Sequence, residues 1–418
     1  MKKRMILITE AFPYGKGEKS FIMPELPYLQ REYEVSICSR LHQTNDLSIN
    51  YKTQIDDSIK VYNYDYVSKW KLIQKGIFFI FDRETWKEYI RIIKKGKYVF
   101  GRLIQASKFS VIAYAFFRTL EQQYELKGNV IIMYSYWNDI SAYASVLCKK
   151  KYKNIVAISR IHGGDLYEER AEYQYQPFKT TMNQYLNGIV FACENAQKYY
   201  VETYIHKLDL NKLYLSRLGV GRKEIGQVNN KKKFLLVSCS FVIPLKRIDL
   251  IIEALALLCD EEIVWYHFGD GTELERLAEL AARKIPSNIQ YKFQGYVDNA
   301  DIIKFYSDNQ VDCFITTSMT EGGCPVAIQE ALSFGVPVIG TAVGGIKETI
   351  EKNGIYLSQN PDAIEVADAI RRVYYLSNDE KENLRKKSIE LWGQRFDAHK
   401  NSMKFMEILN EVISKSNM

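Results

Sequence analysis

The sequence predicts an α/β protein with two doubly wound domains. At 418 residues the chain exceeds what one hydrophobic core usually organises, so two domains are expected. Runs of β-forming apolar residues alternate with helical stretches, which is typical of parallel sheets covered by helices. The polar stretch 222–233 separates two such series and predicts a linker between them.

The first series begins with an apolar strand at 5–9, a glycine-containing turn at 12–18 and a helix near 24–31. Further strands are expected where short apolar runs recur, at 35–38, 130–133, 156–159 and 189–192. The stretches between them are long enough for crossover helices. Residues 1–221 are therefore assigned to an N-terminal domain.

The second series begins at 234–237, directly after the polar stretch. Its other strands are expected at 263–267, 289–294, 313–317 and 336–340. The pair Gly344-Gly345 predicts a turn into another helix. Residues 222–390 form the C-terminal domain, and 391–418 have the apolar spacing of a helix.

Composition indicates a folded, cytoplasmic protein. Hydrophobic residues make up 47% of the chain and charged residues 26%, unlike a disordered protein. The seven cysteines are scattered and form no C-x-x-C pair, which favours reduced thiols. The five histidines show no metal-ligand spacing. No signal peptide is evident, and no run approaches the roughly 20 apolar residues of a membrane span.

Positive charge is concentrated in residues 69–102. Ten Lys and Arg face only Asp82, Glu84 and Glu88 there, a local balance of +7 that equals the formal charge of the whole chain. Aromatic and aliphatic residues interleave with these lysines, so the segment is a candidate for peripheral contact with an anionic membrane surface. The alternative is a set of helices packed on the domain with a solvated basic face. No nucleic-acid motif accompanies the charge.

The densest polar pattern lies in 311–348. A strand leads into the loop Glu321-Gly322-Gly323-Cys324-Pro325, a short helix carries Glu330, and a second strand ends near Gly344-Gly345. Helix N-termini at one edge of a sheet favour a phosphate-bearing ligand. Carboxylates favour sugar and ribose hydroxyls instead. The combination predicts a nucleotide-sugar site.

This stretch resembles the group 1 retaining glycosyltransferases of GT-B fold. The shared pieces are a Glu, a glycine loop with Pro, a second Glu heading Glu330-Ala331, then Gly335-Val336-Pro337-Val338 and Gly344-Gly345. One feature departs from the family. Eight residues separate Glu321 from Glu330 where the family has seven, so Glu330 carries over well whereas Glu321 must be re-aimed.

The resemblance implies two facing Rossmann-like domains with a cleft between them, and a C-terminal helix that packs back on the N-terminal domain. It implies that Lys246 contacts the donor diphosphate. Ser240 stands where the family often has an Arg, and Arg247 is expected to compensate. Glu330 is expected to bind the ribose. The other implied donor-binding positions are Gly17, Gly269, Val297 and the loop Gly322, Gly323, Cys324 and Pro325.

A second pattern follows the strand at 156–159. His162-Gly163-Gly164-Asp165-Leu166-Tyr167 looks like the His-Gly-x-Asp-Leu-Tyr loop of the polysaccharide-building branch of this family. The resemblance implies that His162 lies at the reacting centre and that Asp165 and Arg170 organise the acceptor side. With Lys246 and Glu321, His162 completes the expected catalytic set.

The expected function is retaining transfer of a sugar from a nucleotide diphospho-sugar to a hydroxyl of a lipid-linked surface polysaccharide. The chain has no Asp-x-Asp, so no metal and no cofactor are expected. Two alternatives stay open: a nucleotide-sugar epimerase of the same fold, and a non-catalytic donor-binding subunit of a polysaccharide assembly complex. A dehydrogenase is disfavoured because Gly15-Lys16-Gly17-Glu18 is not a G-x-G-x-x-G fingerprint.

Overall fold

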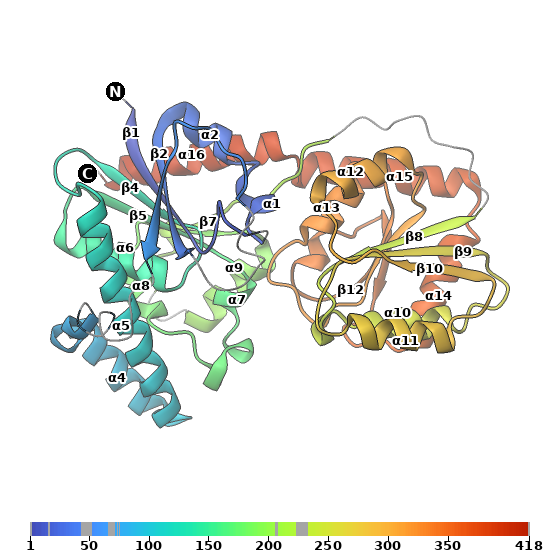
Figure 1. The fold of residues 1–418 in the computed structure, drawn as a ribbon, viewed down its shortest axis with the longest axis horizontal. Helices are drawn as coiled ribbons and strands as arrows, with labels where there is room; N and C mark the ends of the chain where they lie inside the picture. Colours follow the sequence, from blue (N-terminus) through green and yellow to red (C-terminus); the bar gives the residue numbers. More distant parts are fainter. Residues whose placement is uncertain are drawn as a thin grey trace. The chain divides into compact units, whose positions relative to one another are not determined.

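The computed structural model describes residues 2–15, 17–42, 52–65, 72, 74, 76–204, 208–222 and 233–416 (Figure 1). The chain forms two compact units. The first comprises Met1–Ser216 together with Ser402–Met418, and the second comprises Arg217–Asn401. The expected linker lies mostly outside the described residues.

The first unit contains a seven-stranded parallel sheet in the order β3-β2-β1-β4-β5-β6-β7. Its strands are β1 (Lys3–Thr9), β2 (Tyr33–His42), β3 (Lys60–Asp65), β4 (Ile131–Ser135), β5 (Ile155–Ile161), β6 (Gly188–Phe191) and β7 (Leu213–Leu215). The chain runs outward from β1 to β3 and then returns to β4 on the other side of β1. This reversal creates a topological switch point between β1 and β4.

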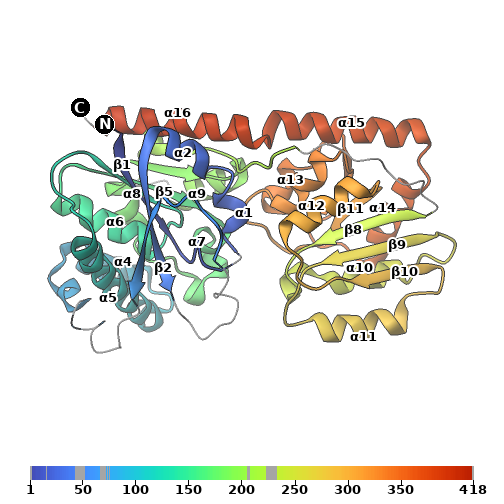
Figure 2. The ribbon, with the colours of Figure 1, turned by 45° about the horizontal axis from the view of Figure 1, so that its top comes forward.

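Nine described α-helices belong to this unit, the last of them contributed by the C-terminus. They are α1 (Lys19–Ile22), α2 (Leu26–Glu32), α4 (Arg83–Lys95), α5 (Val99–Gln123), α6 (Ile140–Lys151), α7 (Gly163–Leu166), α8 (Lys179–Tyr185), α9 (Glu194–Tyr204) and α16 (Ala398–Ser416). Figure 2 shows α16 lying beside α2 and β1. Phe405 and Leu409 of α16 share a buried cluster with Met5 and Leu7 of β1. Burial of this apolar face holds the C-terminal helix on the first unit.

The second unit contains a six-stranded parallel sheet in the order β10-β9-β8-β11-β12-β13. Its strands are β8 (Phe234–Cys239), β9 (Ile263–Phe268), β10 (Ile289–Phe293), β11 (Cys313–Thr316), β12 (Val338–Thr341) and β13 (Gly354–Leu357). The described α-helices within it are α10 (Ile248–Leu255), α11 (Leu274–Lys284), α12 (Asn299–Asp308), α13 (Val326–Ser333), α14 (Ala363–Tyr374) and α15 (Asn378–Arg395). Helices α10, α11 and α14 cover one face of the sheet, and α12, α13 and α15 cover the other (Figure 1). The predicted α/β fold class, with two doubly wound sheets, is confirmed.

Two features of the fold differ from the sequence-based expectation. Strands β3, β7 and β13 were not expected, because they are short edge or near-edge strands without a long apolar run. The helix expected after Gly344-Gly345 is wrong: Gly344–Glu348 forms a single 3₁₀ helix. The short connection from β12 to β13 leaves no room for an α-helix there.

Among the described helices, none is both long enough and apolar enough to cross a membrane. In the same part of the chain, no cluster of three or more His, Cys, Asp or Glu side chains has an arrangement that would hold a metal ion.

Candidate active site

In the second unit, polar side chains gather where β8 and β11 end. These two strands are neighbours, and the chain leaves them toward opposite sides of the sheet, so the switch point lies between them. The loop after β8 leads to the 3₁₀ helix Pro244–Lys246, and the loop after β11 leads to α13. Parallel strands end at one edge, and these loops therefore meet.

Two hydrogen bonds join these loops directly. The backbone N–H of Met319 donates to the Leu245 carbonyl over 2.9 Å. The Thr317 hydroxyl donates to the Arg247 carbonyl over 2.8 Å. These bonds fix the height of each loop relative to the other, so the side chains that follow have defined neighbours.

Lys246 and Glu321 form an ion pair at this junction. The Lys246 ammonium donates to Glu321 Oε1, and each side chain is only 16% exposed. The longer glutamate loop therefore still brings Glu321 to the predicted phosphate-contact lysine. A cation and a carboxylate that are both largely withdrawn from water are poised to exchange this partner for a ligand.

Arg247 has a different role from the one expected of a free cation. Its Nε donates to the Thr317 carbonyl over 2.8 Å, and its Nη1 donates to Asn360 Oδ1 over 2.7 Å. Burial lowers the pKa of its guanidinium. Its backbone adopts the left-handed conformation, with φ of 46°. Arg247 thus holds the two loops together, and its compensation for Ser240 stays a prediction.

Glu330 lies on α13 and is 5% exposed. Its Oε1 accepts a hydrogen bond from the Asn299 amide over 2.5 Å. Burial raises the pKa of Glu330 to about 7, against the smaller lowering effect of Asn299. Burial also raises the pKa of the Cys239 thiol to about 12, with the Glu330 carboxylate adding to it and Lys246 opposing it. Glu330 and Lys246 therefore act on the same side chain at this edge.

The raised pKa of Glu330 predicts a pH-dependent stability. Between about pH 4.5 and 7 the folded carboxyl holds a proton that the unfolded one has lost, so its contribution to stability falls as pH rises. Glu330→Gln should therefore raise the free energy of unfolding of the second unit at pH 8 by up to about 3 kcal/mol, and change it little at pH 4.5. Urea unfolding at both pH values measures this, with the exposed Glu279→Gln as control. An equal effect at both pH values would contradict it.

Backbone packing explains several glycines around the pair. A Cβ at Gly344 would lie 1.8 Å from the Glu321 carbonyl oxygen, and one at Gly269 would lie 1.8 Å from that of Ser240. Only glycine permits these approaches. Gly345 is likewise packed against Gly323, at 2.1 Å from its carbonyl carbon to the position of a Cβ.

The other predicted donor-binding positions lie in this unit. Cys324 is buried, Pro325 forms the N-terminal boundary of α13, and Gly322 and Val297 are partly exposed.

In the first unit, His162 follows β5 and lies among aromatic rings. Its ring centroid is 4.6 Å from that of Trp137, 5.2 Å from that of Tyr136 and 6.1 Å from that of Phe21. Burial lowers the pKa of the imidazole to about 3, and Arg160 adds to this effect. His162 is therefore neutral at physiological pH. Its buried Nε2 has no hydrogen-bond partner within the described residues.

Asp165 lies next to His162 and organises the surrounding loops. Its carboxylate accepts from the backbone N–H of His162 over 2.6 Å and from that of Asn138 over 2.5 Å. Lys179 is buried beside it and donates to the Asn138 side chain over 2.7 Å. Burial raises the pKa of Asp165. The structure thus brings His162 and Asp165 together, with Asp165 as a positioning group.

Arg170 and Gly17 are both exposed. The guanidinium of Arg170 lies 5.8 Å from the ring centre of Tyr167, and Arg170 forms part of no such cluster. At Gly17 a Cβ would meet no atom within 4 Å, so the fold itself does not require glycine there. The open space leaves the backbone accessible to a ligand.

Comparison with known proteins decides the family resemblance. Residues 222–390 match the model of the family described as Glycosyl transferases group 1. The resemblance is confirmed. The matched range contains every predicted donor-binding residue except Gly17, and it contains both Lys246 and Glu321.

Relatives of the whole chain are more distant. Protein CapJ of Staphylococcus aureus is 27% identical over 192 residues, which is 44% of this chain and 47% of CapJ, so the match spans about half of that relative. A glycosyltransferase of Rickettsia africae has a TM-score of 0.69 at 17% identity, covering 99% of both chains. A TarM variant of S. aureus, solved with UDP, α-GlcNAc-glycerol and fondaparinux, has a TM-score of 0.67 at 12% identity, covering 98% of this chain and all of that one. These neighbours confirm the GT-B fold.

Several residues around the group 1 glycosyltransferase motifs were missed by sequence reasoning. Asn299 binds Glu330 from another helix, and Lys179 and Asn138 support Asp165. Glu18 accepts from three backbone N–H groups of the turn after β1, and Trp137 also donates to it over 2.6 Å. Glu18 adjoins the predicted Gly17, and a carboxylate after a glycine turn was the available signal.

Proposed function

We propose that this protein is a retaining, metal-independent glycosyltransferase. It moves a hexosyl group from a nucleotide diphospho-sugar to a hydroxyl of a lipid-linked surface-polysaccharide intermediate. The observation that carries the proposal is the Lys246–Glu321 ion pair at the switch point of the family-matched unit. Lys246 suits a diphosphate, and Glu321 suits sugar hydroxyls.

Donor binding exchanges the partners of this pair. Diphosphate oxygens take the place of Glu321 on the Lys246 ammonium, and Glu321 then accepts from hydroxyls of the donor sugar. When the sugar–phosphate bond breaks, the bonding electrons leave with the diphosphate. Lys246 stabilises that charge as it develops, and the acceptor hydroxyl attacks from the face that the diphosphate leaves.

Glu330 supplies the second contact in this proposal. Its carboxylate accepts hydrogen bonds from the two ribose hydroxyls, as an acidic residue does in dinucleotide folds. Because burial holds the pKa of Glu330 near 7, these donors favour its charged form and donor binding releases a proton. Gly269 and Val297 accompany it at the base, and the loop from Gly322 to Pro325 contacts the sugar and phosphates.

The first unit supplies the acceptor side in this proposal. His162, neutral and with an unpartnered buried Nε2, provides a hydrogen-bonding group for the reacting sugar. Asp165 fixes the backbone that carries it. Arg170 binds the acceptor, and Gly17 allows the donor phosphates to approach the backbone.

Two measurements test the proposal together. Thermal shifts with UDP, GDP, ADP and their sugars should show one nucleoside diphosphate that stabilises the protein, because a ligand that binds the folded state raises its stability. UDP is the first to test, since TarM was solved with it. Product analysis with that donor should then show a new glycosidic bond.

Glu330→Ala should abolish both the shift and transfer, whereas the exposed Glu279→Ala should change neither. A free isomerised sugar would instead identify an epimerase. Binding without turnover would identify a donor-binding subunit, and a flat nucleotide screen would remove the donor site altogether.

A further inference from the structure

Helix α4 has the reverse of the usual amphipathic orientation. Its acidic residues Glu84 and Glu88 face inward and are 2% and 4% exposed. Its large apolar residues Trp86, Ile90 and Ile93 face outward and are 55%, 52% and 58% exposed. Helices of globular proteins normally bury the apolar face and expose the charged one. The outward apolar face of α4 therefore needs a partner outside the chain.

The inward position of the glutamates is fixed by specific bonds. Glu88 accepts from the Tyr175 hydroxyl over 2.6 Å and from the Phe178 backbone N–H over 3.2 Å. Glu84 pairs with Lys87 over 2.6 Å. Buried carboxylates that are hydrogen-bonded in this way stabilise the orientation. Turning the helix over would leave these bonds unmade.

The apolar surface continues on either side of α4. Ten of the twenty large apolar side chains that are exposed among the described residues lie within 77–104. Phe81 of the 3₁₀ helix η2 (Ile77–Phe81) is 80% exposed, and Phe100 of α5 is 78% exposed. An exposed apolar concentration of this kind marks a binding surface. We call the exposed side chains of 77–104 the η2–α4–α5 face.

The charge of this face has one sign. Asp82, Glu84 and Glu88 are its acidic residues, and all three are buried. Arg83, Lys94 and Lys97 are exposed. An apolar surface rimmed by exposed cations fits the headgroup region of an anionic bilayer, where lysines meet phosphates and aromatic rings enter the apolar boundary.

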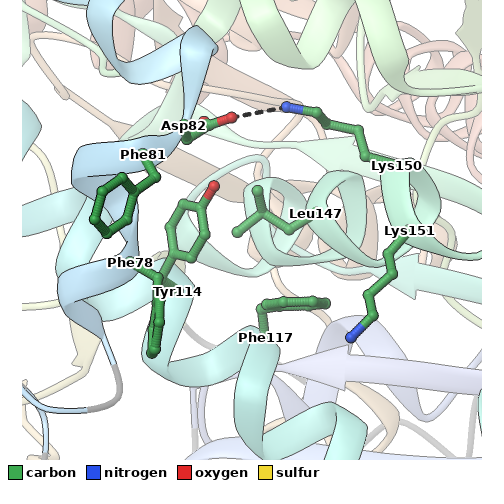
Figure 3. Close-up of a pocket in the computed structure, with 8 residues that line it drawn as sticks. All are labelled: Phe78, Phe81, Asp82, Tyr114, Phe117, Leu147, Lys150 and Lys151. Atoms are coloured by element: carbon green, nitrogen blue, oxygen red, sulfur yellow. Dashed lines mark hydrogen bonds and ion pairs between the residues drawn. The ribbon is translucent and has the colours of Figure 1, made fainter.

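A cavity of about 310 Å³ adjoins the same face (Figure 3). Phe78, Phe81, Tyr114 and Phe117 line it with rings, and Lys150 and Lys151 stand at its edge. Lys150 is paired with Asp82 over 2.9 Å, as Figure 3 shows. Its combination of apolar lining and cationic edge repeats the chemistry of the face.

We propose that the η2–α4–α5 face docks the protein on an anionic lipid bilayer. The side chains of Phe81, Trp86, Ile90 and Phe100 enter the boundary between headgroups and acyl chains, and Arg83, Lys94 and Lys97 contact lipid phosphates. The cavity beside η2 accommodates part of one lipid. Such docking holds a transferase where lipid-linked acceptors lie, although the surface exists independently of the proposed reaction.

Co-sedimentation of the full chain with vesicles tests this proposal. We expect binding to vesicles of phosphatidylcholine mixed with phosphatidylglycerol, much weaker binding to phosphatidylcholine alone, and weakening by salt. Arg83→Glu with Lys94→Glu should lower binding at least about tenfold. The charge-matched control, Arg283→Glu with Lys404→Glu, changes two other exposed cations and should bind almost as the wild type does.

The apolar contribution has its own variant. Ile90→Ser with Ile93→Ser should lower vesicle binding at least about tenfold, because exposed isoleucines are removed without disturbing the fold. Ile364→Ser, at a position that is 62% exposed, is the control. Equal binding by wild type and both double variants would overturn the proposal. So would a lipid-free dimer that Ile90→Ser with Ile93→Ser dissociates, since the face would then bind a second copy. Transfer to a water-soluble acceptor should be unchanged in these variants, which separates this test from that of the reaction.

Discussion

Replacing Lys246 by Met is expected to lower the rate of sugar transfer by about 10²–10³-fold, the usual cost of removing one fixed donor from a developing negative charge. The loss should fall mainly on kcat, because the charge on the diphosphate grows as the bond breaks. Methionine keeps the length of the side chain, so the packing between the two loops is preserved. Steady-state kinetics with the stabilising nucleotide sugar measures the effect.

The control for Lys246→Met is Lys304→Met, which removes an exposed ammonium from α12. A second variant separates chemistry from architecture, since Lys246 also holds Glu321. If Lys246 served only to position Glu321, then Lys246→Met in a Glu321→Gln background would cost nothing further. We expect a further loss of at least about tenfold in that background. Full activity of the single variant would rule out contact between Lys246 and the diphosphate.

The sequence predicted the sheets better than it predicted the site. Central strands such as β1 and β8 are continuous apolar runs because both faces of a parallel sheet are covered. Strand β7 has only three residues, so no periodicity could identify it. The helix expected after Gly344-Gly345 failed for a related reason: the distance in the sheet to β13, and not the glycine pair, sets the length of that connection.

Site residues were predictable only where a local motif contained them. Lys246, Glu321 and Glu330 each occur in such a motif, and the structure pairs the first two. Asn299 could not be predicted, because it reaches Glu330 from a separate helix and its own sequence is an ordinary helix start. The contacts that set a pKa or orient a carboxylate are long-range, and one sequence does not record them.

The inverted orientation of α4 shows the same limit. Interleaved basic and apolar residues suggested either a membrane surface or a packed helix with a solvated basic face. Only the bonds of Glu88 to Tyr175 and Phe178, far along the chain, reveal which face is turned inward.

Glu25→Ala is expected to lower the free energy of unfolding of the first unit by about 3–5 kcal/mol, because it leaves a buried guanidinium without its counter-ion. Arg160 is fully buried, and its Nη2 donates to Glu25 Oε1 over 2.5 Å. Its other bonds, to the Tyr134 hydroxyl and the Ser216 carbonyl, each over 2.8 Å, hold the charge in place when Glu25 is absent. Hydrogen exchange of the β5 amides measures this unit separately from the other.

The exposed Glu34→Ala on β2 controls for the loss of a carboxylate and should change the free energy of unfolding by less than about 0.5 kcal/mol. Removing both charges, in Glu25→Leu with Arg160→Met, should recover part of the loss, because no unpaired charge then remains buried. A double variant less stable than Glu25→Ala would show that the bonds of Arg160 to Tyr134 and Ser216 outweigh the cost of burying its charge. A loss below about 1 kcal/mol for Glu25→Ala would mean that water reaches the guanidinium and that the pair does not hold β5 to the start of α2.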